Sequence, residues 1–173
     1  MNGVDETNAA RFVRGIVAGA VAGAAASFAM DRFQAAWTAL TSSRDADADD
    51  GEPSQPATVK AADAVAKAVA GRPVPKPDEP LAGQAVHYAL GIGLGIAYAI
   101  AAEYRPAVTA GYGTAFGLGT ATVLDEAIVP AVGLGEAPWK SDVGTTFYGV
   151  ASHLVFGVAA EAVRRSLRAT LVA

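Results

Sequence analysis

The chain has 173 residues, 52% of them hydrophobic, with a net charge of −4 and no cysteine. Soluble domains are usually ~45–50% apolar when glycine is counted as apolar. The 52% of this chain does not include its 19 glycines, so its apolar share is higher still. The acidic balance and the lack of a basic patch argue against nucleic acid as a partner, and the absence of cysteine excludes disulfides and thiolate metal sites. Composition therefore favours one integral membrane domain that has the lipid bilayer as its main partner.

The first apolar segment, about 12–30, follows two arginines and is long enough to cross a membrane. Its small residues recur every four positions, so they share a helix face that another backbone can approach closely: Gly15, Gly19 and Gly23. A secretory signal peptide is the rival interpretation, because small residues also follow the apolar core near 24–29. The length of the apolar run and its amphipathic continuation to Leu40 favour a membrane span.

A polar connection at 42–81 separates this span from the rest of the chain. Its first part is rich in Asp and is expected to be disordered. The next part, 58–70, predicts a short amphipathic helix closed by Gly71, lying on the membrane surface or against the bundle. The four prolines of RPVPKPDEP then predict a stiff extended linker.

Three further spans are predicted at about 83–103, 107–129 and 143–163, which gives an all-α four-helix membrane bundle. Small residues again recur at helical spacing and predict packing faces: Gly91, Gly95, Gly113, Gly117, Gly149 and Gly157. Trp139, in the loop before the last span, is expected to anchor at the membrane interface. The glycine-rich first span also predicts association into a homo-oligomer or a larger membrane complex.

Charged residues at the span ends set the expected orientation. The predicted boundary residues besides Trp139 are Glu103, Arg105, Glu161, Arg164 and Arg165. Basic residues are almost evenly divided between the two sides, but those on the side of the termini lie directly at the span ends. Both termini are therefore predicted in the cytoplasm, with 42–81 outside. Glu161 and the paired arginines predict a boundary ion pair with a role at lipid headgroups.

A candidate polar cluster lies in the outer half of the predicted bundle and comprises Asp31, His87, Asp125, Glu126 and His153. At 1.5 Å per residue, His153 lies roughly 15 Å from the outer end of its helix, and His87 and Asp125 lie roughly 6–8 Å from theirs. An ionisable residue inside a span costs ~3 kcal/mol and usually faces the protein interior or water. Three interpretations stay open: interhelical hydrogen bonds that fix packing, a proton-responsive or ion-conducting cavity, and a metal or haem site.

Spacing within the second half of the chain also resembles a known family. His87 stands sixteen positions before Glu103, which lies in AAEYRP, and Pro130 precedes APW. SHLVFGVAAEAVRRSLR then combines a histidine, a glutamate and paired arginines, with Ser152 where the family has glycine. From Gly83 to Arg168 the chain resembles the YagU-like bacterial inner-membrane proteins, a domain of unknown function. The resemblance implies a bacterial inner-membrane location and supplies no reaction.

The predicted function is that of a non-enzymatic inner-membrane protein with an accessory, assembly or envelope stress-response role. A proton- or ion-handling channel or transporter that uses the outer-half His and Asp residues is the alternative, and a metal- or haem-binding membrane protein is the third. No cofactor and no catalytic residue are assigned.

Overall fold

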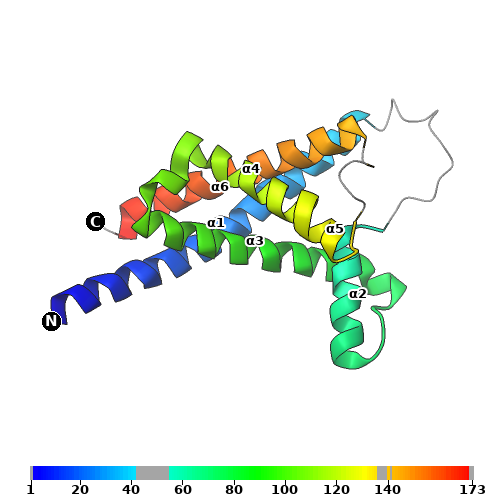
Figure 1. Ribbon diagram of the computed structural model, residues 1–173, viewed down its shortest axis with the longest axis horizontal. Helices are drawn as coiled ribbons and strands as arrows, with labels where there is room; N and C mark the ends of the chain where they lie inside the picture. The colour runs from blue at the N-terminus through cyan, green and yellow to red at the C-terminus, as the bar shows by residue number, and fades with distance from the viewer. Residues whose placement is uncertain (1, 42–54, 136–139, 141, 172–173) are drawn as a thin grey trace.

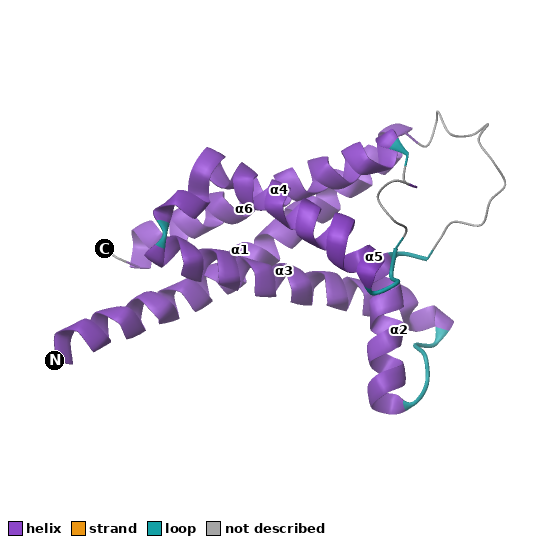
Figure 2. Cartoon of the chain, viewed as in Figure 1, coloured by secondary structure: helices purple, strands orange, loops and turns teal. Residues whose placement is uncertain are grey.

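The computed structural model describes residues 2–41, 55–135, 140 and 142–171, and every regular element in them is helical (Figures 1 and 2). The α-helices are α1 (Asn2–Thr41), α2 (Ala57–Ala70), α3 (Glu79–Tyr104), α4 (Thr114–Thr120), α5 (Val129–Ala131) and α6 (Val143–Leu171). Two 3₁₀ segments, η1 (Lys76–Asp78) and η2 (Pro106–Gly113), and a π-helix, η3 (Ala121–Ile128), complete the order. The expected disordered stretch near 42–54 and the anchor Trp139 lie outside the described residues.

Three helical segments are long and apolar enough to cross a membrane: Asn8–Thr41, Lys76–Tyr104 and Val143–Thr170. They contain the predicted spans 12–30, 83–103 and 143–163. Length and composition therefore indicate a multi-pass membrane protein.

The predicted span at 107–129 is not one continuous helix, which corrects the sequence-based expectation. Ala110 to Tyr112 leave the helical region, with Gly111 at φ 63° and Tyr112 at φ 56°. Helical backbone resumes at Thr114 and continues through α4, η3 and α5 to Ala131. This segment runs back along the molecule beside α6 (Figure 1), although it is not among the three candidate spans.

Small residues determine how the long helices pack. α3 lies along α1, α1 along α6, and α6 along α4. A Cβ atom added to Gly19 of α1 would lie 2.5 Å from the Cα of Ile96, and one added to Gly95 of α3 would lie 2.6 Å from the Cα of Gly23. Real Cβ atoms do not approach so closely, so glycine allows the backbones of α1 and α3 to touch.

α2 packs against α3 and crosses it steeply (Figure 1). Val59 and Ala62 are its buried residues, and Gly71 ends it at φ 71°, donating its N–H to the Lys67 carbonyl at 3.0 Å. Of the two positions expected for this amphipathic helix, the structure shows the one against the helical bundle. The proline linker is shorter than predicted, because Lys76 already begins a 3₁₀ turn and Pro80 lies in the first turn of α3, where its missing N–H costs nothing.

Candidate functional site

The first His–carboxylate pair joins α1 to α3. Asp31 Oδ1 lies 3.2 Å from His87 Nε2, and the Gln84 side-chain amide donates to Asp31 Oδ2 at 2.7 Å. Gln84 and His87 are three residues apart, so they share one face of α3. His87 Nε2 is within ion-pair distance of the carboxylate without the geometry of a hydrogen bond. Two side chains on the same face of α3, those of Gln84 and His87, therefore contact Asp31.

The second pair joins η3 to α6. Asp125 Oδ2 lies 3.0 Å from His153 Nε2. His153 is only 8% exposed, whereas the Asp125 side chain is 41% exposed. Gly149 lies one turn before His153, and a Cβ there would meet Asp125 Oδ2 at 3.5 Å, an ordinary contact distance, so the pair does not depend on this glycine.

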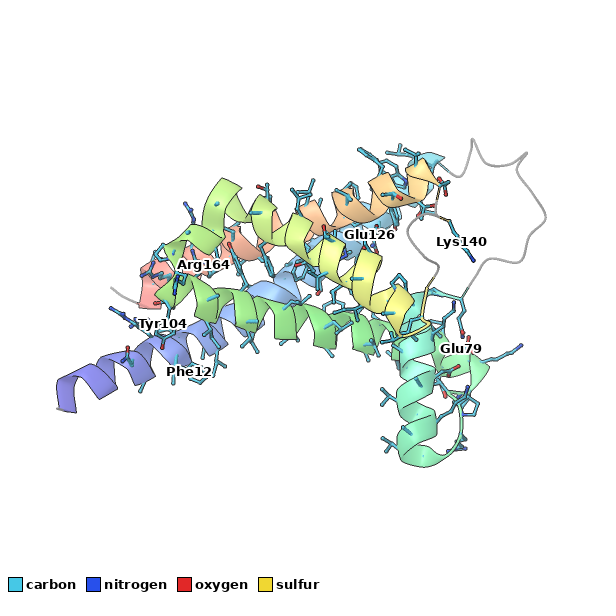
Figure 3. The ribbon with its side chains drawn as sticks, viewed as in Figure 1. Phe12, Glu79, Tyr104, Glu126, Lys140 and Arg164 are labelled. Carbon is cyan, nitrogen blue, oxygen red and sulfur yellow. The ribbon has the colours of Figure 1, made fainter. Side chains whose placement is uncertain are left out.

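Asp125 owes its position to the π-helical segment. A π-turn holds one residue more than an α-turn, so the side chains that follow it are rotated around the helix axis. Pro130 lacks the N–H that would bond to the Glu126 carbonyl, which favours a widened turn here. Glu126, labelled in Figure 3, makes no ion pair or side-chain hydrogen bond with another described residue.

The five predicted cluster residues thus form two separate pairs and one unpaired carboxylate. Across the described part of the chain, no three His, Cys, Asp or Glu side chains come together as a metal-ligand set. Within that part, each of the two histidines lies beside one carboxylate on a neighbouring helical segment.

A larger ionic network lies at the other end of the molecule, around Glu161. This side chain is fully buried, and it accepts from the Tyr98 hydroxyl at 2.8 Å. Arg164 donates to both of its oxygens, from Nε at 2.7 Å and Nη2 at 2.9 Å. Arg165 adds a third cationic contact at 2.6 Å. Such bidentate, charge-assisted bonds are the strong ones in proteins.

Glu103 extends this network toward the chain ends. Its carboxylate is nearly buried and lies 3.6 Å from Arg14 Nη2 and 3.3 Å from Arg168 Nε. Glu103 on α3 therefore links α1 and α6 through ion pairs with Arg14 and Arg168. Arg105, also predicted at this boundary, is exposed.

Sequence reasoning placed Glu161 and its arginines at a boundary but assigned no site role to Tyr98 or Tyr112. The Tyr98 ring stacks on Phe116 at 4.2 Å between centroids, and Arg165 lies 4.7 Å from the ring centre of Tyr112. A clue was available, because a carboxylate inside an apolar helix needs more donors than its own helix supplies. Tyr98 lies near the end of α3, at the same level along the bundle as Glu161, so its hydroxyl can supply such a donor.

Comparison with known proteins identifies the chain at the level of a family. A family model described as "Protein of unknown function (DUF1440)" matches residues 71–162, just over half of the chain. The chain belongs to the DUF1440 family. No curated protein and no solved structure matches it.

The DUF1440 segment contains α3, the whole helical return from η2 to α5, and most of α6. It includes both histidines, Asp125 and Glu161. Asp31 and the arginines of the last turns of α6 lie outside the matched residues. The Asp31–His87 pair and the Glu161 network therefore combine family positions with positions beyond the match, whereas the Asp125–His153 pair lies wholly within it.

Proposed function

We propose that this DUF1440 protein is a non-enzymatic protein of the bacterial inner membrane, with both termini in the cytoplasm. In this proposal it acts as an accessory or assembly unit, or in the envelope stress response. The observation that carries the proposal is that each polar pair joins two different helical segments: α1 to α3 through Asp31 and His87, and η3 to α6 through Asp125 and His153. Interhelical polar contacts in membranes contribute ~0.6 kcal/mol each, so the two pairs together favour this packing arrangement modestly.

The outer face of α1 supports a partner-binding role. Val13, Val17 and Val21 recur every four residues and are each about half exposed, with Phe28 further along the helix. Such a row faces either lipid or a second protein. A rigid bundle with an apolar outer face suits assembly with another membrane protein.

A pull-down of the tagged full-length chain in mild detergent, read by mass spectrometry, tests this proposal. We expect a partner, or further copies of this chain, at a fixed ratio. Substitution of Val17 by Thr, which keeps the β-branch but adds a hydroxyl to the exposed row, should weaken that association. Purification as a monomer with no stoichiometric companion would reject the accessory role.

A proton-responsive protein is the second candidate, and the Asp125–His153 pair favours it. The Asp125 side chain is 41% exposed and lies 3.0 Å from the nearly buried His153 ring, so it connects this ring to the surroundings. If the protein moves protons, reconstituted liposomes should show a pH-dependent flux that His87→Ala and His153→Ala reduce and Glu126→Gln leaves intact. A flux that both histidine variants leave unchanged, or no flux at all, would reject this candidate.

A further inference from the structure

An open pocket of about 660 Å³ lies where the end of α3 and the start of η2 meet the last turns of α6. Its polar lining comes from Thr109, Arg164, Arg165 and Arg168. Figure 3 shows Arg164 and Tyr104 at this end, where both termini lie. The pocket is therefore at an end of the candidate spans, far along α6 from His153.

The charges around the pocket do not cancel. Among the described residues, the guanidinium groups of Arg14, Arg164, Arg165 and Arg168 pair with two carboxylates, those of Glu103 and Glu161. Two positive charges therefore remain uncompensated by this network. An excess of guanidinium groups in a concave site attracts an anion.

Arg164 supplies the second observation. It is 5% exposed, and its Nε and Nη2 are both bonded to Glu161. Its remaining nitrogen, Nη1, is buried and has no hydrogen-bond partner within the described structure. An unpaired donor on a buried charged group is costly, so the Arg164 guanidinium keeps hydrogen-bonding capacity that the described protein groups do not use.

Tyr112 does not line the pocket but contacts one of its arginines, Arg165. It adopts a left-handed backbone conformation at φ 56°, which is uncommon for a residue with a side chain. Its ring lies under the Arg165 guanidinium at 4.7 Å, a cation–π contact that orients the arginine. Strained backbone conformations persist mainly where they have a function, and here the result is a positioned guanidinium.

We propose that this pocket binds a phosphate group, carried by an anionic phospholipid headgroup or present as free phosphate. Guanidinium groups match phosphate oxygens in geometry and charge, and a cluster of arginines at a span end lies at headgroup depth. The half-exposed Arg165 and Arg168 are the donors, and the buried positive charge of Arg164 adds to the attraction. Neither His–carboxylate pair lines this pocket, so phosphate binding here does not depend on the function proposed above.

The test uses full-length protein in neutral detergent. Native mass spectrometry compares retention of phosphatidylglycerol with that of phosphatidylcholine of the same chain length, and calorimetry measures binding of inorganic phosphate. The variant Arg165→Gln/Arg168→Gln removes two half-exposed guanidinium groups and leaves the Arg164–Glu161 pair intact. The control Arg11→Gln/Arg105→Gln removes the same charge at the same end from exposed residues that do not line the pocket.

We expect the wild-type protein to prefer phosphatidylglycerol. The pocket variant should bind it roughly ten- to thirtyfold more weakly, because it loses two lining guanidinium groups that can contact the phosphate directly, a contact that the control residues cannot make. The control should change affinity by no more than about twofold. Binding of inorganic phosphate with the same sensitivity identifies free phosphate as the ligand source, and lipid binding alone identifies the headgroup.

Equal weakening by the pocket and control variants would overturn the proposal, as would equal retention of the two lipids without phosphate binding. If size-exclusion chromatography shows that the double variant is misfolded, Arg168→Gln alone provides the comparison. Its side chain is half exposed and contacts the protein through Glu103. A threefold or larger loss of affinity in that single variant supports the pocket, and wild-type affinity rejects it.

Discussion

His153 has its two ring nitrogens in different environments. Nε2 faces Asp125 at 3.0 Å, whereas Nδ1 is buried without a partner in the described part of the chain. A neutral imidazole carries one proton and can present it at only one nitrogen. The Asp125 carboxylate close to Nε2 therefore favours a proton on that nitrogen.

A double-mutant cycle of His153→Ala and Asp125→Asn should show a coupling of ~0.6 kcal/mol, and at most ~1.7 kcal/mol, because interhelical polar bonds in membranes have this range. The measurement is reversible unfolding in mixed micelles of SDS and a mild detergent. Glu126→Gln is the matched control: it neutralises the neighbouring carboxylate, which has no ion pair among the described residues, and should not couple to His153. Strict additivity of the His153 and Asp125 changes would contradict the pair.

Asp142 caps the first turn of α6. Its carboxylate accepts from the Thr145 hydroxyl at 2.5 Å and from the Thr145 N–H at 3.0 Å. These bonds lower the pKa of Asp142, the hydroxyl bond most and the backbone bond next. The cap is fully effective above the ordinary carboxyl pKa of ~3.9 and is lost as the pH falls through the lowered folded-state value.

Acid should therefore loosen the first turn of α6. In hydrogen exchange of residues 143–147, corrected for intrinsic rates, protection should fall when the pH is lowered from about 6 to below the ordinary value of ~3.9. Asp142→Asn keeps a capping oxygen and should show no such pH dependence, whereas Asp142→Ala should exchange faster at both pH values. Identical pH profiles for wild type and Asp142→Asn would show that this carboxylate is not responsible.

At the scale of the elements, glycine positions decide which helices touch. Gly95 and Gly93 lie on the same helix, two residues apart, yet a Cβ on Gly95 would collide with α1, whereas one on Gly93 would meet nothing within 4 Å. Both glycines incur the same helix-propensity cost of about 1 kcal/mol relative to alanine. Their difference therefore isolates the interhelical contact.

Gly95→Ala should lower the melting temperature in detergent, because overpacking a tight contact costs about 1–3 kcal/mol and exceeds the propensity gain. Gly93→Ala should leave it unchanged or raise it. The measurement is fluorescence-detected thermal unfolding of the two variants beside the wild type. A Gly95→Ala protein as stable as the Gly93→Ala control would show that the α1–α3 contact is looser than described.

At the scale of the whole molecule, both termini lie at one end (Figure 1). The return from η2 to α5 is divided, but it runs between the two ends of the bundle, beside the three candidate spans found among the described residues. The arginine network lies at the end with the termini. Positive residues next to spans favour the cytoplasmic side.

Topology reporters fused at four positions along the chain should therefore report opposite sides of the membrane in alternation. Fusions after Arg105 and near the C-terminus should report the cytoplasm, and fusions after Gly71 and Gly133 the opposite side, as measured by paired fluorescent-protein and alkaline-phosphatase fusions. A cytoplasmic signal after Gly133 would mean that the segment from η2 to α5 does not cross. The fusion after Gly71 serves as the control, since it depends on α1 alone.

The residue types and their spacing were sufficient to predict the all-α class, the three long apolar helices, the amphipathic α2 and its Gly71 cap. These features follow from local properties: apolar run length, helical periodicity and the conformational freedom of glycine. The histidines and acids were recognisable as unusual because charge inside an apolar run is costly wherever it occurs.

Only the tertiary structure decided which of these residues meet. The π-turn at Ala121–Ile128, the left-handed Tyr112 and the close approach of α1 to α3 set how far each helix is rotated, and none of them has a period that a single sequence displays. Partner choice depends on those rotations, so one expected cluster became two pairs, and Tyr98 reached Glu161 across 63 residues of chain. Interactions between distant segments have no local signature, because they are determined by the packing of the whole bundle.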